Sequence, residues 1–378
     1  MRDERTRLSK RLAPLALTPI LSLLIGSTQG VPDPRPTIPD WPIEITASPI
    51  SQNLWGQTFG ALKLRAILDL NSSDDHFGGW SGLLVEPDGA LLALSDRAAL
   101  LRAKFVMDGN QVPAGIADGV MGVLRDEGGD QAPRLRSDAE GFARLPNGMY
   151  VVSFETPARI GFYDFGAHGA SVPLRLGPAL ALTAKLNLHY QLEAVTTLQD
   201  GAILVGSERG FSGGDKAVLW RVPESEESNG NAIEPWTKLQ LPRGLSLTDL
   251  AAAPDGSVFA LFRQFTPYIG ARAQIWRYKL PEKDGKAHAE GQMLAALEAP
   301  LPVDNYEGLA VTATADGRLR LYVISDDNFR KRQRTLLLTF DLDDEAKQKG
   351  AGTQRLLELQ TRKPEAVTPP GLRPAPPS

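Results

Sequence analysis

Residues 304–328 decide the fold, and they read DNYEGLAVTATADGRLRLYVISDDN. Two apolar runs flank the dipeptide Asp316-Gly317. Such a dipeptide between apolar runs is a strong β-hairpin signal, because the central residues of a tight turn adopt the positive φ that Gly and Asp tolerate. Glu307 stands near the start of the first run and Asp326 near the end of the second. The stretch therefore predicts a β-hairpin with acidic residues at its open end.

Four earlier stretches of the chain repeat this plan. Their turns are centred on Gly89, Gly148, Gly201 and Gly256, and successive turn glycines, with Gly317 as the last, lie 59, 53, 55 and 61 residues apart. Each interval has room for about four short strands with their loops. A repeat of this length built from antiparallel strands is the signature of a β-propeller.

We expect an all-β fold, a β-propeller of six blades, each a four-stranded antiparallel sheet. The five hairpins account for five blades. Residues 160–163, 217–222 and 274–278 are predicted as third strands because they are short apolar runs that follow a hairpin. We expect the residues before Ser81 and a strand at 334–340 to form the sixth blade, so that strands from the two ends of the chain share the closing blade.

The first thirty residues have the plan of a secretory signal peptide. Five basic residues precede the mostly apolar run 12–26, and small residues precede Val31. The apolar run is short for a membrane span. We therefore expect cleavage, a periplasmic or secreted protein, and no membrane span after cleavage. An uncleaved membrane anchor is the alternative.

The remaining chain divides into three predicted parts. Residues 31–59 begin with many prolines and are interpreted as a linker that leads into the folded domain. Residues 60–342 are predicted to form the propeller domain. Residues 343–378 form a C-terminal extension, which we expect to be disordered from about residue 363 because of its prolines.

Composition excludes several kinds of function. Removal of residues 1–30 takes the formal charge from −4 to −7, and a mildly acidic exported protein is a poor candidate for nucleic-acid binding. Cys is absent, which excludes disulfides, a Cys nucleophile and thiolate metal sites. The four His residues lack ligand spacing, which argues against zinc. We expect a monomer that binds a small molecule.

The hairpin register predicts which residues face one another at the open ends. With two-residue loops, the expected facing pairs are Ser81 and Asp96, Glu140 and Glu155, Glu193 and Glu208, Thr248 and Arg263, and Glu307 and Asp326. All five pairs fall on one rim of the propeller. Three of them set one carboxylate against another, which is repulsive unless a cation lies close by.

Two explanations of this acidic rim remain open. Arginines near the end of each second strand provide structural compensation in the first, and they are Arg97, Arg159, Arg209, Arg263 and Arg330. In the second, the acidic ends bind a hard divalent cation such as Ca²⁺, which takes six to eight oxygen ligands. The candidate metal ligands are Asp304, Glu307, Asp326 and Asp327.

Two short motifs carry less weight. Residues 210–214 read GFSGG, which fits the nucleophile-elbow pattern G-x-S-x-G. That motif requires a strand-to-helix turn, whereas a strand is predicted after it here. Asn71-Ser72-Ser73 fits the glycosylation sequon, a pattern that matches often by chance.

The repeated motifs resemble the phytase-like domain family, labelled "esterase-like activity of phytase", over about residues 60–342. The residues that carry the resemblance are FGGWSG (77–82) with SDR (95–97), DAEG (138–141) with SFE (153–155), LEA (192–194) with SE (207–208), and DNYEGL (304–309) with ISDDNF (324–329) and QRT (333–335). The resemblance implies an exported bacterial β-propeller. It also implies the hydrolysis of an ester such as a phosphate monoester. The fourth repeat departs from the pattern, because it opens with Thr248-Asp249 and closes with Arg263.

The sequence thus predicts a hydrolase of a phosphate or carboxylic ester with a divalent cation at one rim, and an anionic ester as substrate. Glu140, Glu193 and Glu307 are the candidate catalytic residues, as general bases with or without a metal. Arg97, Arg209 and Arg263 are the candidates for binding a substrate anion. A non-catalytic propeller that binds a ligand or a protein on its rim is the alternative, and a sugar-lactonase-like propeller is a third possibility.

Overall fold

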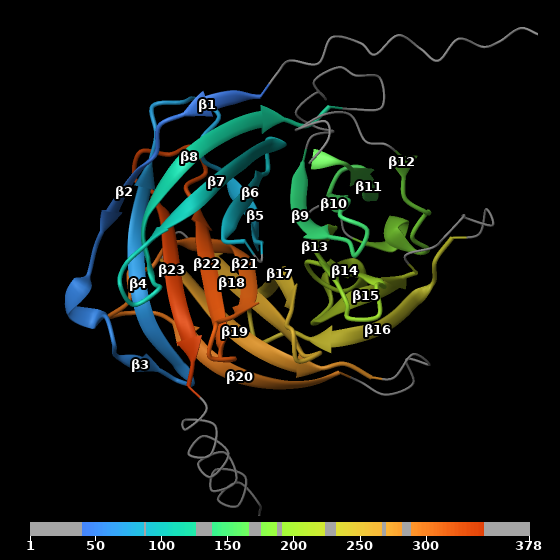
Figure 1. The fold of residues 1–378 in the computed structure, drawn as a ribbon. Coiled ribbons are helices and arrows are strands. Elements are labelled where there is room, and N and C mark those ends of the chain that lie inside the picture. Colours follow the sequence, from blue (N-terminus) through green and yellow to red (C-terminus); the bar gives the residue numbers. More distant parts are fainter. Residues whose placement is uncertain are drawn as a thin grey trace, which may run out of the picture. The chain divides into compact units, whose positions relative to one another are not determined.

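Five antiparallel sheets arranged around a common axis make up the described part of the chain (Figure 1). The structure is a computed structural model, and it describes residues 40–86, 88–125, 138–165, 175–186, 191–223, 232–266, 270–281 and 289–343, with the side chains of 265 and 266 left aside. The expected signal peptide and nearly all of the C-terminal extension lie outside these residues. All described residues belong to one unit, residues 37–378.

Each sheet is one blade of a propeller, and we number the blades in chain order. Blade 1 has the strand order β1-β8-β7-β6-β5, with bounds β1 Trp41–Ile43, β5 Trp80–Val85, β6 Ala90–Ser95, β7 Ala99–Met107 and β8 Pro113–Val123. Blade 2 has the order β12-β11-β10-β9, with bounds β9 Ala139–Arg144, β10 Tyr150–Phe154, β11 Arg159–Tyr163 and β12 Arg175–Leu176.

Blades 3 and 4 each have four strands. Blade 3 contains β13 Leu192–Thr197, β14 Ile203–Ser207, β15 Lys216–Val222 and β16 Pro235–Gln240. Blade 4 contains β17 Ser246–Ala252, β18 Val258–Thr266, β19 Gly270–Lys279 and β20 Glu290–Leu297. The predicted third strands are confirmed as β11, β15 and β19.

Blade 5 joins the two ends of the folded unit. Its strand order is β2-β4-β23-β22-β21, with bounds β2 Thr46–Pro49, β4 Leu62–Asn71, β21 Asn305–Ala313, β22 Leu319–Asp326 and β23 Thr335–Leu342, and β3 Thr58–Phe59 pairs with β4. The expectation that strands from both ends share the closing blade is confirmed. The prediction of a sixth blade is wrong. β23 pairs with β22, and β4 pairs with β23, so these strands complete the sheet of the fifth hairpin.

The segment interpreted as a linker contributes strands where it is described. β1 pairs with β8 in blade 1, and β2 pairs with β4 in blade 5. Three 3₁₀ helices occur in loops, at Gln52–Leu54, Thr183–Lys185 and Phe211–Gly213. None of the helices in the described ranges has the length and apolar character that crossing a membrane requires.

The first strand of each hairpin lies nearest the axis. β5 contacts β9, β9 contacts β13, β13 contacts β17, β17 contacts β21, and β21 contacts β5. These inner strands approach one another closely, as two glycines show. A Cβ on Gly141 would lie 2.9 Å from the Glu193 carbonyl oxygen, and a Cβ on Gly82 would lie 2.8 Å from Cδ1 of Phe142. Larger side chains at these positions would therefore push neighbouring blades apart.

The hairpin turns differ from the expected two-residue type. In the second hairpin the N–H of Leu145 donates to Met149 O and the N–H of Gly148 donates to Leu145 O, and the other four hairpins make the same pair of bonds. Each is a three-residue loop whose last residue is a Gly with φ between 81° and 87°. Positive φ is the reason for Gly at this position, as predicted, but the loop is one residue longer.

Each inner strand also contains a β-bulge near its open end, at the residue after Trp80, Ala139, Leu192, Leu247 or Tyr306. A bulge places an extra residue on one strand and shifts the register beyond it. The five predicted facing pairs are therefore wrong in detail. In the structure Asn305 faces Asp326 and Ser246 faces Arg263.

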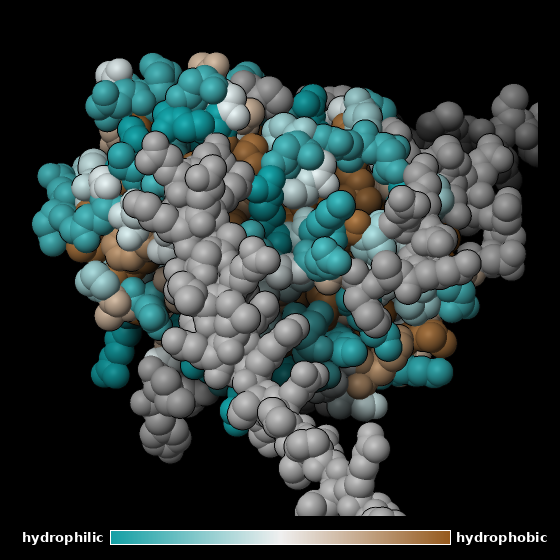
Figure 2. Space-filling model, turned by 90° about the horizontal axis from the view of Figure 1, so that it is seen from below, coloured by the Kyte–Doolittle hydropathy of each residue, from teal (hydrophilic) through white to brown (hydrophobic). Residues whose placement is uncertain are grey.

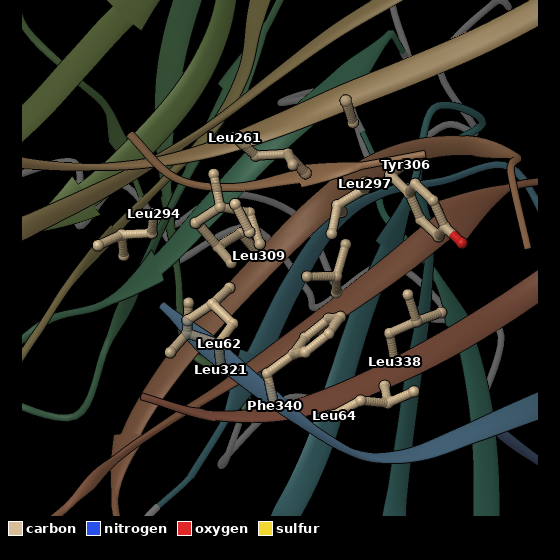
Figure 3. Packing of buried hydrophobic residues seen from close by; sticks show 14 of the residues in the cluster. Leu62, Leu64, Leu261, Leu294, Leu297, Tyr306, Leu309, Leu321, Leu338 and Phe340 are labelled. Carbon is tan, nitrogen blue, oxygen red and sulfur yellow. The ribbon is translucent and has the colours of Figure 1, made fainter. Parts of the chain in front are cut away.

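Apolar side chains fill the space between blades. Figure 3 shows part of the cluster between blades 4 and 5, where Leu261 and Leu294 meet Leu321, Leu338 and Phe340. Leu261, Leu321, Leu338 and Phe340 have no measurable solvent exposure. On the face seen in Figure 2, hydrophilic side chains of the described residues surround smaller hydrophobic areas. The strands thus bury their apolar residues between the sheets, as the alternation in the sequence predicts.

Replacement of Gly148 by Ala should lower the free energy of unfolding by about 1–2 kcal/mol, because a residue with a Cβ is strained at φ 87°. The matched control is Gly109→Ala, since both glycines have open space around the added Cβ but only Gly148 has a positive φ. Urea denaturation measures both variants. Equal destabilisation by the two substitutions would contradict the turn assignment.

Candidate functional site

The five bulges place one extra residue each at the same end of the propeller. These residues are Ser81, Glu140, Glu193, Thr248 and Glu307. A bulge turns a side chain away from the regular alternation of the strand and often does so next to a functional site. All five are buried, and Glu140, Glu193 and Glu307 are only 7–8% exposed.

The ends of the second strands carry a second set of charged residues. Main-chain hydrogen bonds hold Asp96 opposite Gly79, Glu155 opposite Asp138 and Glu208 opposite Gln191, at N···O distances of 2.8, 2.9 and 2.8 Å. Arg263 and Asp326 occupy the corresponding places in blades 4 and 5. Together with the bulge residues they form what we call the carboxylate cluster, and its members are Asp96, Asp138, Glu140, Glu155, Glu193, Glu208, Glu307 and Asp326.

Glu140, Glu193 and Glu307 lie close together, as the sequence predicts. Burial is the main cause that raises the pKa of Glu140 and of Glu193 well above the usual range, and repulsion from neighbouring carboxylates, Glu307 among them, adds to it. The same two causes act on other members of the cluster. They raise the pKa of Asp96 to about 6, of Glu208 to about 7 and of Asp326 to about 8. The predicted catalytic residues are thus brought into one electrostatic unit.

Arg263 forms an ion pair within this cluster. Its Nη2 lies 2.8 Å from Oε1 of Glu307. Burial lowers the pKa of Arg263, but attraction from Glu307, Glu193 and Glu208 outweighs it and the net shift is upward. The guanidinium is therefore firmly charged. Removal of such a buried partner is costly because it leaves a carboxylate uncompensated.

The other predicted arginines have different surroundings. Nη1 of Arg209 donates to Oγ of Ser246 at 3.2 Å. The guanidinium carbon of Arg97 lies 3.3 Å from the centre of the Phe329 ring, and that of Arg159 lies 4.0 Å from the centre of the Phe154 ring. Arg330 is exposed. Attraction from Arg97 lowers the pKa of Asp96, and attraction from Arg209 lowers the pKa of Glu208, but burial outweighs both and the net shifts are upward.

Asn305 connects two carboxylates of blade 5. Its Nδ2 donates to Oε1 of Glu307 at 2.7 Å and to Oδ2 of Asp326 at 3.1 Å. The Oδ1 atom of Asn305 is buried and has no hydrogen-bond partner. A buried acceptor without a partner costs free energy unless a ligand satisfies it. Carboxylate and amide oxygens at one place are the donor set that hard cations prefer, so the residues present fit a divalent cation.

Two of the predicted metal ligands have their oxygens occupied by main-chain groups. Asp304 accepts hydrogen bonds from the N–H of Asn305 and of Arg334. Asp327 accepts from the N–H of Gly79 and of Phe329, both at 3.0 Å. Glu307 and Asp326 lie within the carboxylate cluster. Oδ1 of Asp326 also accepts a main-chain hydrogen bond, from the N–H of Asn328, so the metal-ligand role stays a prediction for all four residues.

The sequence predicts Glu155 and Glu208 on the rim, opposite Glu140 and Glu193, but it assigns no role to them or to Asp138. Ligand oxygens of Asp138, Glu140 and Glu155 all lie within 4.8 Å of one another. Burial and a hydrogen bond that the protonated Glu155 carboxyl donates to Asp138 raise the pKa of Glu155 to about 8. The acidic residues at the open ends of the repeats indicate this group in the sequence. The register predicted without a bulge does not show that Asp138 faces Glu155.

The remaining motifs stay outside this site. Residues 210–214 form a 3₁₀ turn over Phe211–Gly213 that leads into strand β15, so the helix that a nucleophile elbow requires is missing at that point. Asn71 is exposed at the end of β4 and donates to Oδ1 of Asp69 at 3.0 Å. A cavity of about 600 Å³ lies between the hairpin turns of blades 1 and 5, lined by charges of both signs that include Lys104, Arg318 and Asp316. It is at the turn end, away from the carboxylate cluster.

Comparisons with known proteins agree with this architecture. The family model "Phytase-like: Esterase-like activity of phytase" matches residues 75–329. This range contains blades 2 to 4, blade 1 except β1, and strands β21 and β22 of blade 5, and it includes every member of the carboxylate cluster. The chain belongs to this family. The comparison with curated proteins finds no match.

Solved structures with similar folds are distant. A gluconolactonase from Xanthomonas campestris is 15% identical, with a TM-score of 0.39, and the match covers 81% of this chain and 99% of that one. A putative oxidoreductase (glucose dehydrogenase) from Thermus thermophilus is 12% identical, with a TM-score of 0.38 and coverage of 79% and 99%. Virginiamycin B lyase from Staphylococcus aureus is 12% identical, with a TM-score of 0.31 and coverage of 73% of each chain. At these scores the likenesses carry no argument about the reaction.

The raised pKa values predict an unusual dependence of stability on pH. A carboxyl with a folded-state pKa above its unfolded value near 4 gives its full stabilisation below that value and loses it as the pH rises through the folded-state pKa. For Glu155 and Asp326 that value is about 8. In cation-free buffer, Glu155→Gln should therefore become more stable relative to wild type as the pH rises from 5 to 8. Thermal melting measures this difference.

The matched control for that experiment is Glu44→Gln, because Glu44 is exposed and lies outside the cluster. Its melting temperature should follow wild type at every pH. If the Glu155→Gln difference stayed constant or shrank with rising pH, the electrostatic description of the cluster would be wrong.

Proposed function

We propose that this protein is an exported hydrolase of a phosphate or carboxylic ester, with its site at the carboxylate cluster. Membership of the phytase-like family supports the reaction class. The single observation that carries the proposal is the burial of Glu140, Glu193 and Glu307 together at one end of the propeller, where burial and mutual repulsion raise the pKa of the neighbouring carboxyls. Structural ion-pair networks also perturb pKa values. A ligand site is favoured here because the Oδ1 atom of Asn305 is buried beside these carboxylates without a hydrogen-bond partner.

Glu307 and Asp326 with Asn305, and Asp138 with Glu140 and Glu155, are the residues that would hold a divalent cation, with Ca²⁺ as the first candidate. When bound, such an ion would polarise an oxygen of the ester. Glu140 and Glu193 would act as general bases, because burial raises the pKa of each well above the usual range of a carboxyl and a carboxylate with a raised pKa is a stronger base. Arg263 would balance the charge of Glu307, and Arg97 and Arg209 would hold a substrate anion.

Export to the periplasm or the medium is part of the proposal. The basic start and the apolar run of residues 12–26 support it. The substrate would then be a small anionic ester that the protein meets outside the cytoplasm, with the protein acting as a monomer.

Cation binding is tested by thermal melting of the purified protein in EDTA and then in excess CaCl₂. Saturation at 100 times the dissociation constant stabilises a protein by about 2.7 kcal/mol, which is a shift of several degrees for a domain of this size. Glu307→Gln and Asp326→Asn should lose most of the shift, and Glu44→Gln should keep it. The same shift in all three variants would place the cation elsewhere.

Hydrolysis is tested separately with p-nitrophenyl phosphate and p-nitrophenyl acetate. We expect activity toward at least one ester, and we expect kcat/KM to fall by about 100-fold or more in Glu307→Gln, consistent with the loss of a general base or of a cation ligand. Activity equal to wild type in that variant would remove Glu307 from the mechanism. A calcium-dependent shift without hydrolysis of either ester would favour a ligand-binding propeller instead.

A further inference from the structure

Two consecutive residues after β22 have a strained main chain. Asn328 has φ 49° and Phe329 has φ 51°. A left-handed conformation is uncommon for a residue with a Cβ, and for a bulky residue such as Phe it is an outlier. Strain of this kind persists only where the surroundings impose it, and it clusters at ligand-binding sites. The question is what this turn achieves.

Carboxylates of the preceding residues hold the turn in place. Oδ1 of Asp326 accepts a hydrogen bond from the N–H of Asn328 at 2.5 Å. Oδ1 of Asp327 accepts from the N–H of Phe329 and from the N–H of Gly79, each at 3.0 Å. Gly79 belongs to the loop that enters blade 1, so Asp327 connects the turn of blade 5 to the neighbouring blade.

The strained turn brings the Phe329 ring against Arg97. The guanidinium carbon lies 3.3 Å from the ring centre, which is the geometry of a cation–π stack. The ring also lies against Gly79, where a Cβ would be 2.4 Å from Cε2 of Phe329 and 2.5 Å from Oδ1 of Asp96. The ring, the guanidinium and a carboxylate of the cluster are therefore packed at one place.

One hydrogen-bond donor of Arg97 has no partner in this arrangement, while its charge attracts the neighbouring Asp96. Within the described residues its guanidinium has no ion pair, and its Nε is buried without a hydrogen-bond partner. The Nε of Arg263 is also buried without a partner, but its Nη2 is paired with Glu307. A guanidinium that is fixed by an aromatic face presents its donors as a rigid fork, and this fork matches the oxygens of a phosphoryl group or a carboxylate.

We infer that Phe329 is a positioning residue, which holds Arg97 as the subsite for an oxyanion of the substrate, either a phosphoryl group or a carboxylate. The inference rests on the proposed function, because it assigns the subsite to the same cluster. It distinguishes two of the three predicted substrate-binding arginines: Arg97 binds the anion, and Arg263 balances buried charge. The main-chain strain at Asn328 and Phe329 is the free-energy cost of placing the Phe329 ring against Arg97.

The test is the affinity of the mature protein for inorganic phosphate and for acetate, measured by calorimetry in EDTA and again with Mg²⁺. We expect one of the two anions to bind, and its identity tells which group the subsite takes. Arg97→Gln and Phe329→Leu should each weaken that anion at least tenfold. Arg97→Lys should not restore binding, because an ammonium lacks the fork. Phe329→Tyr should bind as wild type does, because it retains the ring.

The matched control is Arg175→Gln. Arg175 stacks on Phe162 at 3.6 Å, but it lies on the exposed outermost strand of blade 2. The Arg175→Gln variant should bind the anion as wild type does. Melting curves of all variants show whether they are folded, and Phe329→Tyr keeps the test decisive if Phe329→Leu unfolds.

Binding of neither anion by wild type, or unchanged affinity in Arg97→Gln, would overturn the inference. Equal weakening by Phe329→Leu and Phe329→Tyr would also overturn it, because the ring would then not be what matters. These readouts do not depend on turnover. An Arg97-dependent anion site in a protein that hydrolyses no ester would refute the proposed catalysis and leave the subsite standing.

Discussion

The close approach of five inner strands around one axis is the constraint on which the rest of the structure depends. With five blades, β5, β9, β13, β17 and β21 touch their neighbours directly. Gly141 and Gly308 show how little room remains, since a Cβ on either would meet backbone atoms of the neighbouring blade at about 3 Å. Any side chain that a bulge directs toward the axis must therefore share a small space with its counterparts.

This crowding explains the electrostatics. A glutamate at the bulge of one blade would be an ordinary carboxylate, but bulge glutamates in three blades meet one another and the acidic ends of the second strands. Burial removes water from them, and their mutual repulsion adds to the same effect, so both causes favour the protonated form. Arg263 relieves part of the repulsion through Glu307. The remaining repulsion between carboxylates is confined to this site. Exposed ion pairs elsewhere, such as Lys104 with Asp118, contribute little to stability.

The sequence predicts the repeat and the convergence of Glu140, Glu193 and Glu307, because the turn glycines and the acidic ends recur in phase. It does not predict the register. The extra loop residue and the bulge each shift the pairing by one, and neither changes the order of residue types along a strand. The blade count fails for another reason: whether Leu62–Asn71 pairs with Thr335–Leu342 in an existing blade depends on contacts across the whole chain, which no local pattern records.

Blade 4 makes the site asymmetric. Where blades 1, 2 and 5 have Gly82, Gly141 and Gly308 after the bulge, blade 4 has Asp249, which is almost fully buried. Its Oδ2 accepts from the N–H of Leu309 at 2.7 Å, so the carboxylate crosses to the inner strand of blade 5 just beyond Glu307. The same blade supplies Arg263 where blades 1, 2, 3 and 5 supply acids. The departure of the fourth repeat is thus what makes a nearly symmetric ring asymmetric. It fixes the backbone beside Glu307 and places one cation against it. The same guanidinium also attracts Glu193 and Glu208 of blade 3.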